Sequence, residues 1–136
     1  MQTELTAPRL GLERTGRQYP VASLLAAGAR LSFGSDWPVS SHVPLEGVQV
    51  VVTRVPLEDP AAEAWVPGER VGVEEALVAY TAGVAYQAGA EHERGTLVPG
   101  AVADLVHLSA DPRAVDPLEI AATTVLGTWL AGRRTA

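Results

Sequence analysis

One acidic side chain stands in a setting that could carry chemistry: Asp36, within the run Gly34–Pro38 (Gly-Ser-Asp-Trp-Pro). A carboxylate there can bind a metal ion or take a proton from an attacking water molecule. It can also form a turn, because Asx turns ahead of a proline are common, and on these five residues alone the turn is the more common case. The neighbouring Ser35 lacks a Gly-x-Ser-x-Gly elbow and a spaced histidine base, so the run does not predict a serine nucleophile.

Few other groups in the chain could take part in catalysis. His42 follows Asp36 in the same loop and could reach a substrate, although most single loop histidines are only solvated. The three histidines form no His-x-His or His-Glu-x-x-His cluster; we expect His92 at the surface and His107 packed within a strand. The absence of cysteine and lysine excludes thiol nucleophiles, thiolate zinc sites, Schiff bases and carboxylated lysine bridges.

Composition narrows the class of protein. The 136 residues suit one domain and fall short of the roughly 250 residues of a large barrel enzyme. Hydrophobic residues make up 47%, enough to fill a core. The net charge of −6 comes without a basic patch, which argues against nucleic acid or an anionic membrane as a partner. No run approaches the roughly 18 apolar residues of a membrane span and no signal peptide is visible, so we expect a cytoplasmic location.

The elements on either side must position the loop that holds Asp36. Residues 1–19 are polar and interrupted by proline and glycine, which predicts a loop. Pro20 then begins a helix whose apolar face ends at Gly28. Leu31–Phe33 predicts a short strand. In β/α architectures sites are built in the loop after the carboxyl end of a strand, which is where Asp36 lies.

The segment after this loop is ambiguous. In residues 44–55 the apolar positions fit the helix and strand periods about equally, and we expect a helix that begins at Pro44. Residues 56–72 are rich in proline and glycine, which predicts a long irregular loop.

A clean apolar stripe follows this loop. It consists of Val73, Ala76, Leu77, Tyr80 and Val84, which have the spacing of one helix face, and we assign Tyr86 to the same stripe. We therefore expect a helix with both tyrosines in the core. Gly83 could split this helix in two, and Gly89 should end it.

The last third of the chain changes character. Short runs rich in valine, leucine, threonine and tryptophan predict strands at 95–98, 102–108 and 120–130, separated by Pro-Gly and Asp-Pro turns. Asp104 follows a turn and is expected to accept backbone N–H bonds that fix a hairpin. So few short strands cannot bury both faces of a sheet, and the strand at 31–33 has no parallel neighbour in the first half. The pattern predicts a fragment or an obligate assembly.

Several stretches become distinctive when their order and spacing are taken together. They are Arg14, Tyr19-Pro20, Gly28-Ala29, Leu31, Gly34–Val39, Pro44, Thr53-Arg54, Glu75–Leu77, Ala79–Thr81, Ala85-Tyr86, Gly95, Leu97, Gly100, Ala103–Val106, Thr128-Trp129 and Gly132-Arg133. In this order the chain resembles the C-terminal third of the amidohydrolase superfamily, most closely amidohydrolase family 3 with its N-substituted formamide deformylase-like enzymes. The resemblance covers about residues 14–134.

The resemblance implies an α/β fold: the C-terminal fragment of a (β/α)8 TIM-like barrel, followed by strands of a small β-sandwich domain. Residues 1–91 would hold the last barrel strand and the helices after it. Residues 92–136 would hold the C-terminal strands of the sandwich. The other barrel strands would lie outside this chain.

The resemblance also implies hydrolysis of a carbon–nitrogen, amide-type, non-peptide bond in a small molecule by metal-activated water. It places Asp36 at the position of a metal ligand and proton shuttle, with a divalent metal, zinc being the expected ion. Trp37 and His42 are the candidates for the substrate pocket, although packing at the barrel rim is the more common role for such a tryptophan. The family's histidine and lysine ligands have no match here, so we expect the isolated chain to be inactive and to bind no stoichiometric zinc.

Two other functions stay open on the sequence alone. The same elements could form a non-catalytic module for oligomerisation or packing, because a truncated barrel would expose apolar surface and could associate as a homo-oligomer. A small-ligand-binding domain that uses the Gly34–Pro38 loop is the third possibility. The substrate itself is not predicted, because specificity in such barrels comes from loops after the other strands.

Overall fold

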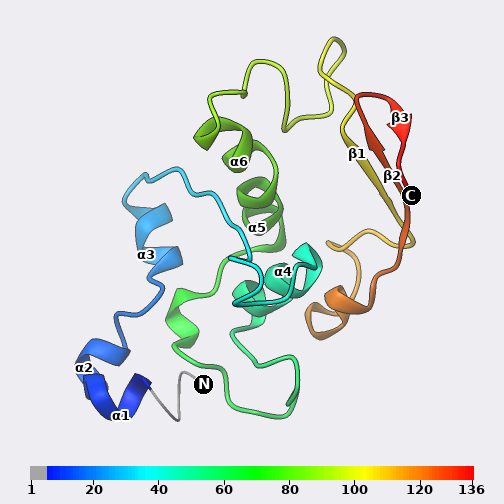
Figure 1. Cartoon of the computed structure of the whole chain (residues 1–136). Coiled ribbons are helices and arrows are strands. Elements are labelled where there is room, and N and C mark those ends of the chain that lie inside the picture. The colour runs from blue at the N-terminus through cyan, green and yellow to red at the C-terminus, as the bar shows by residue number, and fades with distance from the viewer. Residues whose placement is uncertain (1–5) are drawn as a thin grey trace.

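The computed structural model of the chain describes residues 6–136, a mixture of helices with one small antiparallel sheet (Figure 1). No helix in this part of the chain is long and apolar enough to span a membrane. The elements in order are α1 (Ala7–Leu10), α2 (Leu12–Thr15), α3 (Val21–Ala26), α4 (Pro44–Thr53), η2 (Pro67–Glu69), α5 (Val73–Tyr80), α6 (Ala82–Gln87), β1 (Leu105–Leu108), η3 (Pro117–Ala122), β2 (Val125–Leu130) and β3 (Arg133–Arg134).

The first described residues are helical, so the loop predicted for residues 1–19 is wrong over α1 and α2. The two short helices meet at Gly11, whose φ of +75° turns the chain between them. Pro8 sits in the first turn of α1, where a missing N–H loses no helical hydrogen bond. Residues 1–5 of that prediction lie outside the described residues.

Helix α3 agrees with its prediction. It begins directly after Pro20, and the chain turns at Gly28 with a φ of +81°. The strand predicted at 31–33 is not formed, because no other strand lies beside it in the described structure. The N–H of Phe33 donates instead to the carbonyl oxygen of Ala79 in α5, at 3.0 Å. Because this segment has no neighbouring strand with which to form hydrogen bonds, its N–H group is satisfied by a helix carbonyl oxygen.

Helix α4 begins at Pro44, as predicted, and ends at Arg54, which has the left-handed φ of +61°. The predicted loop 56–72 is irregular except for the single turn η2. Its far end returns to the end of α4, where Arg70 Nε donates to the carbonyl oxygen of Thr53 at 2.9 Å.

The helix predicted from Val73 is two helices, α5 and α6. The break falls at Thr81, with φ −123° and ψ −88°, two residues ahead of Gly83. Gly83 instead allows the backbone of Leu31 to approach α6 closely, since a Cβ atom on this glycine would lie 2.0 Å from the carbonyl oxygen of Leu31. Tyr86 is 48% exposed, so its predicted place in the core is wrong.

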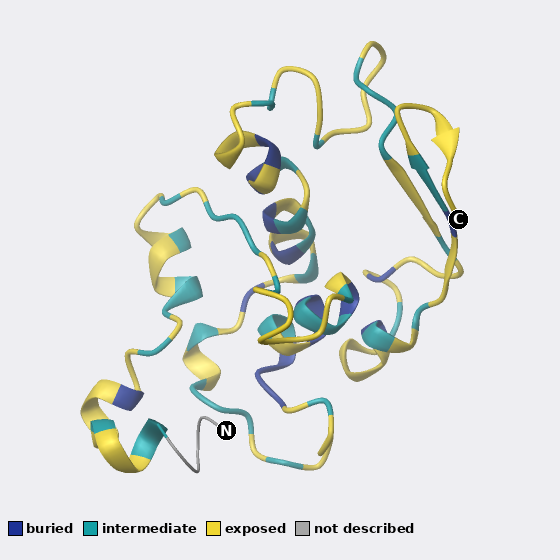
Figure 2. Ribbon diagram, in the orientation of Figure 1, coloured by how far each residue is buried: buried dark blue, intermediate teal, exposed yellow. Residues whose placement is uncertain are grey.

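The core lies where α4, α5 and η3 meet (Figure 2). Val48 and Ile120 are its largest fully buried side chains, 1% and 0% exposed. Gln49 of α4 is 5% exposed, and its side-chain oxygen accepts the N–H of Ala121 at 2.8 Å. The turn η3, which precedes β2, is therefore attached to α4 by both apolar contact and a partly buried hydrogen bond. The buried cluster consists of Leu45, Val48, Val71, Ala76 and Ile120.

The strand predictions for the tail hold in part. Strand β1 lies within the predicted run 102–108 and β2 within 120–130. The run 95–98 forms no strand, and the start of the last run is η3 instead. The sheet has the order β1-β2-β3 with antiparallel pairs, and Leu105 lies opposite Trp129.

Both faces of this sheet are largely exposed, and it stands at one edge of the molecule (Figure 1). This agrees with the expectation that such short strands cannot cover their own faces. His107 is also exposed, contrary to its predicted packing; of the four residues of β1, only Leu108 is partly buried, against the core cluster. The exposed apolar residues of β1 and β2 are Leu105, Val106, Val125, Leu126 and Leu130.

Asp104 has the structural role predicted for it. Its Oδ1 accepts the N–H of Ala131, in the turn between β2 and β3, at 2.8 Å. Its Oδ2 accepts from Arg94 Nη1 at 2.5 Å. The prediction that this carboxylate fixes the hairpin is confirmed.

Candidate functional site

The loop of Asp36 joins segment 31–33 to α4. Asp36 has a φ of +52°, a left-handed conformation that aspartate tolerates better than most residues. The turn is closed by the backbone, since the N–H of Val39 donates to the Asp36 carbonyl oxygen at 2.8 Å. The Ser35 hydroxyl accepts the N–H of Trp37 at 3.3 Å. The Asp36 side chain is exposed, and within residues 6–136 its carboxylate has no hydrogen-bonding or ionic partner.

The two predicted pocket residues lie on the same exposed stretch. Trp37 is 67% exposed, and His42 is also exposed. Neither lines the cavity that the loop borders. The described structure therefore places Asp36, Trp37 and His42 along one surface loop without enclosing them around a common space.

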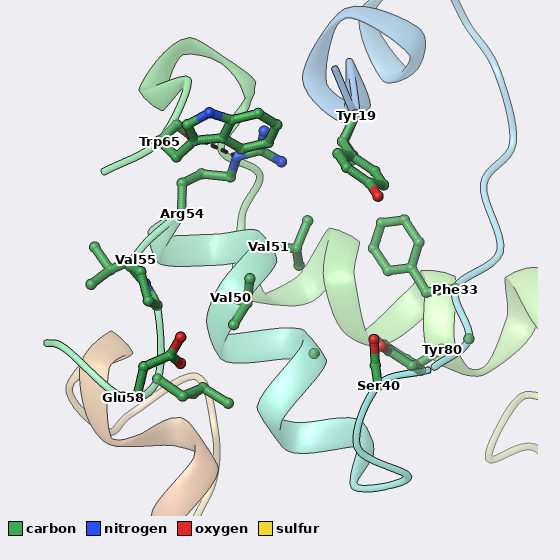
Figure 3. A pocket seen from close by; sticks show the side chains of 15 residues that line it. Tyr19, Phe33, Ser40, Val50, Val51, Arg54, Val55, Glu58, Trp65 and Tyr80 are labelled. Carbon is green, nitrogen blue, oxygen red and sulfur yellow. Dashed lines mark hydrogen bonds between the residues drawn. The ribbon is translucent and has the colours of Figure 1, made fainter. Parts of the chain in front are cut away.

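A cavity of about 570 Å³ opens beside this loop (Figure 3). Gly34 and Ser40, near the two ends of the loop, both line it, so the loop begins and ends at the cavity. One wall is formed by α4. The apolar and aromatic side chains around the cavity include Phe33, Val50, Val51, Val55, Trp65 and Tyr80.

One buried charge lines the cavity: Arg54, only 7% exposed. Its Nε donates to the carbonyl oxygen of Trp65 at 3.1 Å, and its Nη2 to that of Gln18 at 3.5 Å. The guanidinium carbon lies 5.0 Å from the Trp65 ring centroid, within the range of a cation–π contact. Burial lowers the pKa of the Arg54 guanidinium, which nonetheless stays protonated at neutral pH.

Two aromatic pairs shape the cavity. Tyr19 meets Trp65 edge to face at a centroid distance of 6.0 Å, and Phe33 meets Tyr80 at 5.6 Å. A Cβ atom on Gly47 of α4 would lie 2.0 Å from the Tyr80 hydroxyl oxygen, so this glycine makes room for the tyrosine. Burial raises the pKa of the Tyr80 hydroxyl, which therefore remains a hydrogen-bond donor at neutral pH.

Sequence reasoning missed this cavity. It placed Tyr80 in a core stripe and treated residues 56–72, which contain Trp65, as loop. The available signal was Arg54 itself, a charged residue directly after an apolar helix. Its burial depends on contacts with Gln18 and Trp65, which lie far from it along the chain, and no local pattern reveals them.

The side chains that could bind a metal ion are scattered over the described residues. Among residues 6–136, no three histidine, aspartate or glutamate side chains gather closely enough to hold an ion. Asp36 is a single exposed carboxylate, whereas a catalytic zinc takes about three protein ligands. The described residues do not by themselves fit a metal centre.

Three named proteins are similar to this chain. Protein LONG AFTER FAR-RED 3 of Arabidopsis thaliana is 37% identical over 94% of the chain and 22% of its own length. N-substituted formamide deformylase of Arthrobacter pascens is 35% identical over 84% of the chain and 20% of its own length. Amidohydrolase YtcJ of Bacillus subtilis (strain 168) is 34% identical over 92% of the chain and 24% of its own length.

The chain thus spans between a fifth and a quarter of the length of these relatives. No solved structure gives a significant match. The family model described as the amidohydrolase family matches residues 1–136. The match agrees with the resemblance carried by the ordered motifs around Asp36 and Arg54, and it is supported by relatives named as amidohydrolase and deformylase. This chain belongs to the amidohydrolase family.

Proposed function

We propose that this chain supplies the C-terminal part of a hydrolase that cleaves a carbon–nitrogen, amide-type bond in a small molecule. Family membership supports a hydrolytic function, and one relative is named for deformylation of N-substituted formamides. On this proposal residues 1–91 complete a (β/α)8 barrel, and residues 92–136 contribute strands to a β-sandwich. The exposed faces of β1 and β2 support the sandwich, because a second sheet would cover them.

The observation that carries the proposal is the position of Asp36. Its carboxylate has no partner among the described residues, and its loop begins and ends at an apolar cavity large enough for a small substrate. An exposed carboxylate can accept a proton from water and return it to a leaving nitrogen. We assign this proton transfer to the Asp36 carboxylate, with Trp37 and His42, on the same exposed loop, as candidates for contact with the substrate.

Amidohydrolases generally use a divalent metal, and we propose zinc for the whole enzyme. Residues 6–136 do not by themselves form a site for this ion. Asp36 would be the ligand that these described residues offer, and the metal would supply polarisation of the carbonyl group and activation of water when bound.

A chimera tests the proposal. The corresponding segment of the Arthrobacter pascens deformylase is replaced by this whole chain, and hydrolysis of an N-substituted formamide is measured. We expect the chimera to hydrolyse the formamide and Asp36→Asn to reduce kcat at least about a hundredfold. Asp59→Asn, an exposed aspartate in the 56–72 loop, is the matched control and should leave kcat unchanged. Hydrolysis that persists in the Asp36→Asn chimera overturns the assignment of Asp36.

A second candidate function rests on the exposed sheet. Five apolar side chains of β1 and β2 are exposed, and the outer edge of β1 pairs with no strand among the described residues. Such an edge can pair with a second copy of the chain. Sedimentation should then show a mass that rises with concentration, and Val106→Lys should lower it, whereas Leu12→Lys on α2 should not. A constant monomer mass would exclude this candidate.

A further inference from the structure

The wall of the cavity contains a buried charge that the proposed hydrolysis does not use. Arg54 is 7% exposed and lines the cavity beside α4. Within residues 6–136 it forms no ion pair with any carboxylate, although other arginines of the chain do. Its protein partners are two backbone carbonyl oxygens and the face of Trp65.

A buried guanidinium without an anion is unfavourable, because its charge loses water and gains no opposite charge in return. The guanidinium has five N–H donors in a planar fork, and the two carbonyl oxygens engage only two of them. Glu69 and Tyr19 act on Arg54 electrostatically and raise its pKa against the effect of burial, but neither forms an ion pair with it, and the Glu69 carboxylate is hydrogen-bonded to Ser23. The remaining donors suit the two oxygens of a carboxylate.

The rest of the cavity favours an apolar body. Figure 3 shows Val50 and Val51 of α4 and Phe33 around the space that Arg54 and Trp65 border. Glu58 is the other charged side chain in the lining; it is exposed, and the figure draws it beyond Val55 from the guanidinium. The volume of about 570 Å³ lies within the range of small-molecule sites.

We propose that this cavity binds a small organic carboxylate with an aromatic or branched aliphatic body, the carboxylate paired with Arg54 and the body against Val50, Val51 and Trp65. The site is built from this chain's own residues. The cavity is the one that the proposed function offers to a substrate, so this inference rests on that proposal and names the chemical class of the ligand. Binding of the carboxylate by Arg54 itself needs neither a metal nor Asp36.

Calorimetric titration of the whole chain with phenylacetate and with its neutral analogue phenylacetamide tests the proposal. A hydrogen-bonded charge pair of about 1.5 kcal/mol corresponds to roughly tenfold in affinity, so phenylacetate should bind about tenfold more tightly than the amide. Arg54→Gln should remove this preference. Arg17→Gln removes the same charge from an exposed site and should preserve it.

Arg54 also holds the loop that contains Trp65, so its replacement could disturb that loop. A second variant therefore keeps Arg54 and alters another residue of the lining. Val50→Phe fills the cavity from α4 and should weaken binding of both compounds while the chain stays folded. Asp36→Asn should change neither affinity, which separates this test from that of the hydrolase. Equal affinities for the two compounds in the unaltered chain, a preference that survives Arg54→Gln, or no binding at millimolar concentration would each overturn the proposal.

Discussion

Gly83 of α6 lies so close to Leu31 that a Cβ atom on the glycine would stand 2.0 Å from the leucine carbonyl oxygen. The segment that leads to Asp36 therefore runs directly against a helix backbone. Together with the hydrogen bond from Phe33 to Ala79, this contact fixes where the loop begins. The helices α5 and α6 position the loop here, without a strand beside it.

Gly83→Ala should destabilise the chain by about 1–3 kcal/mol, because backbone on both sides must move to admit the methyl group. Urea unfolding followed by circular dichroism measures the change. Gly68→Ala, where an added Cβ would meet nothing within 4 Å, is the control and should cost much less. Equal stability of the two variants would show that the close approach is not maintained in solution.

Gln49→Leu should cost about 1–3 kcal/mol, since it keeps a similar side-chain volume but leaves the N–H of Ala121 without an acceptor. Thermal unfolding gives the size of the loss, and faster amide exchange at Ala121 would locate it. Gln87→Leu, which alters an exposed hydrogen bond with Ser32, serves for comparison and should have a smaller effect. An unchanged exchange rate at Ala121 would contradict the buried hydrogen bond.

The attachment of α3 to η2, through Ser23 and Glu69, should weaken in acid. Two hydrogen bonds from Ser23 to the Glu69 carboxylate lower the pKa of that group below its usual value of 4.5. A lowered folded pKa stabilises the fold above the unfolded pKa, and the contribution is lost as the pH falls through the folded value. Melting temperatures measured from about pH 7 to about pH 3 should fall less steeply in Glu69→Gln than in the unaltered chain. Glu63→Gln should keep the original slope, and identical slopes in all three would exclude this role of Glu69.

The purified chain should hold far less than one zinc ion per molecule, because among residues 6–136 no three acidic or imidazole side chains gather closely enough to hold an ion. Elemental analysis after dialysis against zinc is the measurement. Treatment with a chelator should leave the melting temperature unchanged. Stoichiometric zinc that resists dialysis would reveal ligands that the described geometry does not bring together.

Local signals predicted much of the helical part. Pro20 and Pro44 fix φ near its helical value, and Gly28 can adopt the positive φ that ends a helix, so helix starts and a stop could be placed from their residue types. The same is true of Asp104, whose position after a turn predicted its bond to the backbone. These features are confirmed because they depend on nearby residues.

Predictions that depended on distant partners were less successful. The run at 31–33 has the composition of a strand, but a strand exists only where another lies beside it. Tyr86 is 48% exposed, and the Arg30 guanidinium carbon lies 3.9 Å from its ring centroid, a contact with a distant residue that the helical stripe does not predict. The burial of Arg54 likewise depends on Gln18 and Trp65, so the charged wall of the cavity could not be found from the sequence.

The two bonds of Asp104 have a dynamic consequence. One carboxylate holds both the side chain of Arg94, in the segment that leaves α6, and the backbone of Ala131, at the tip of the last hairpin. Neither the segment that contains Arg94 nor the tip of the hairpin can move far while the Asp104 side chain keeps both hydrogen bonds. In hydrogen exchange, the segment that contains Arg94 and the tip of the hairpin should therefore open as one cooperative unit, with the same opening free energy.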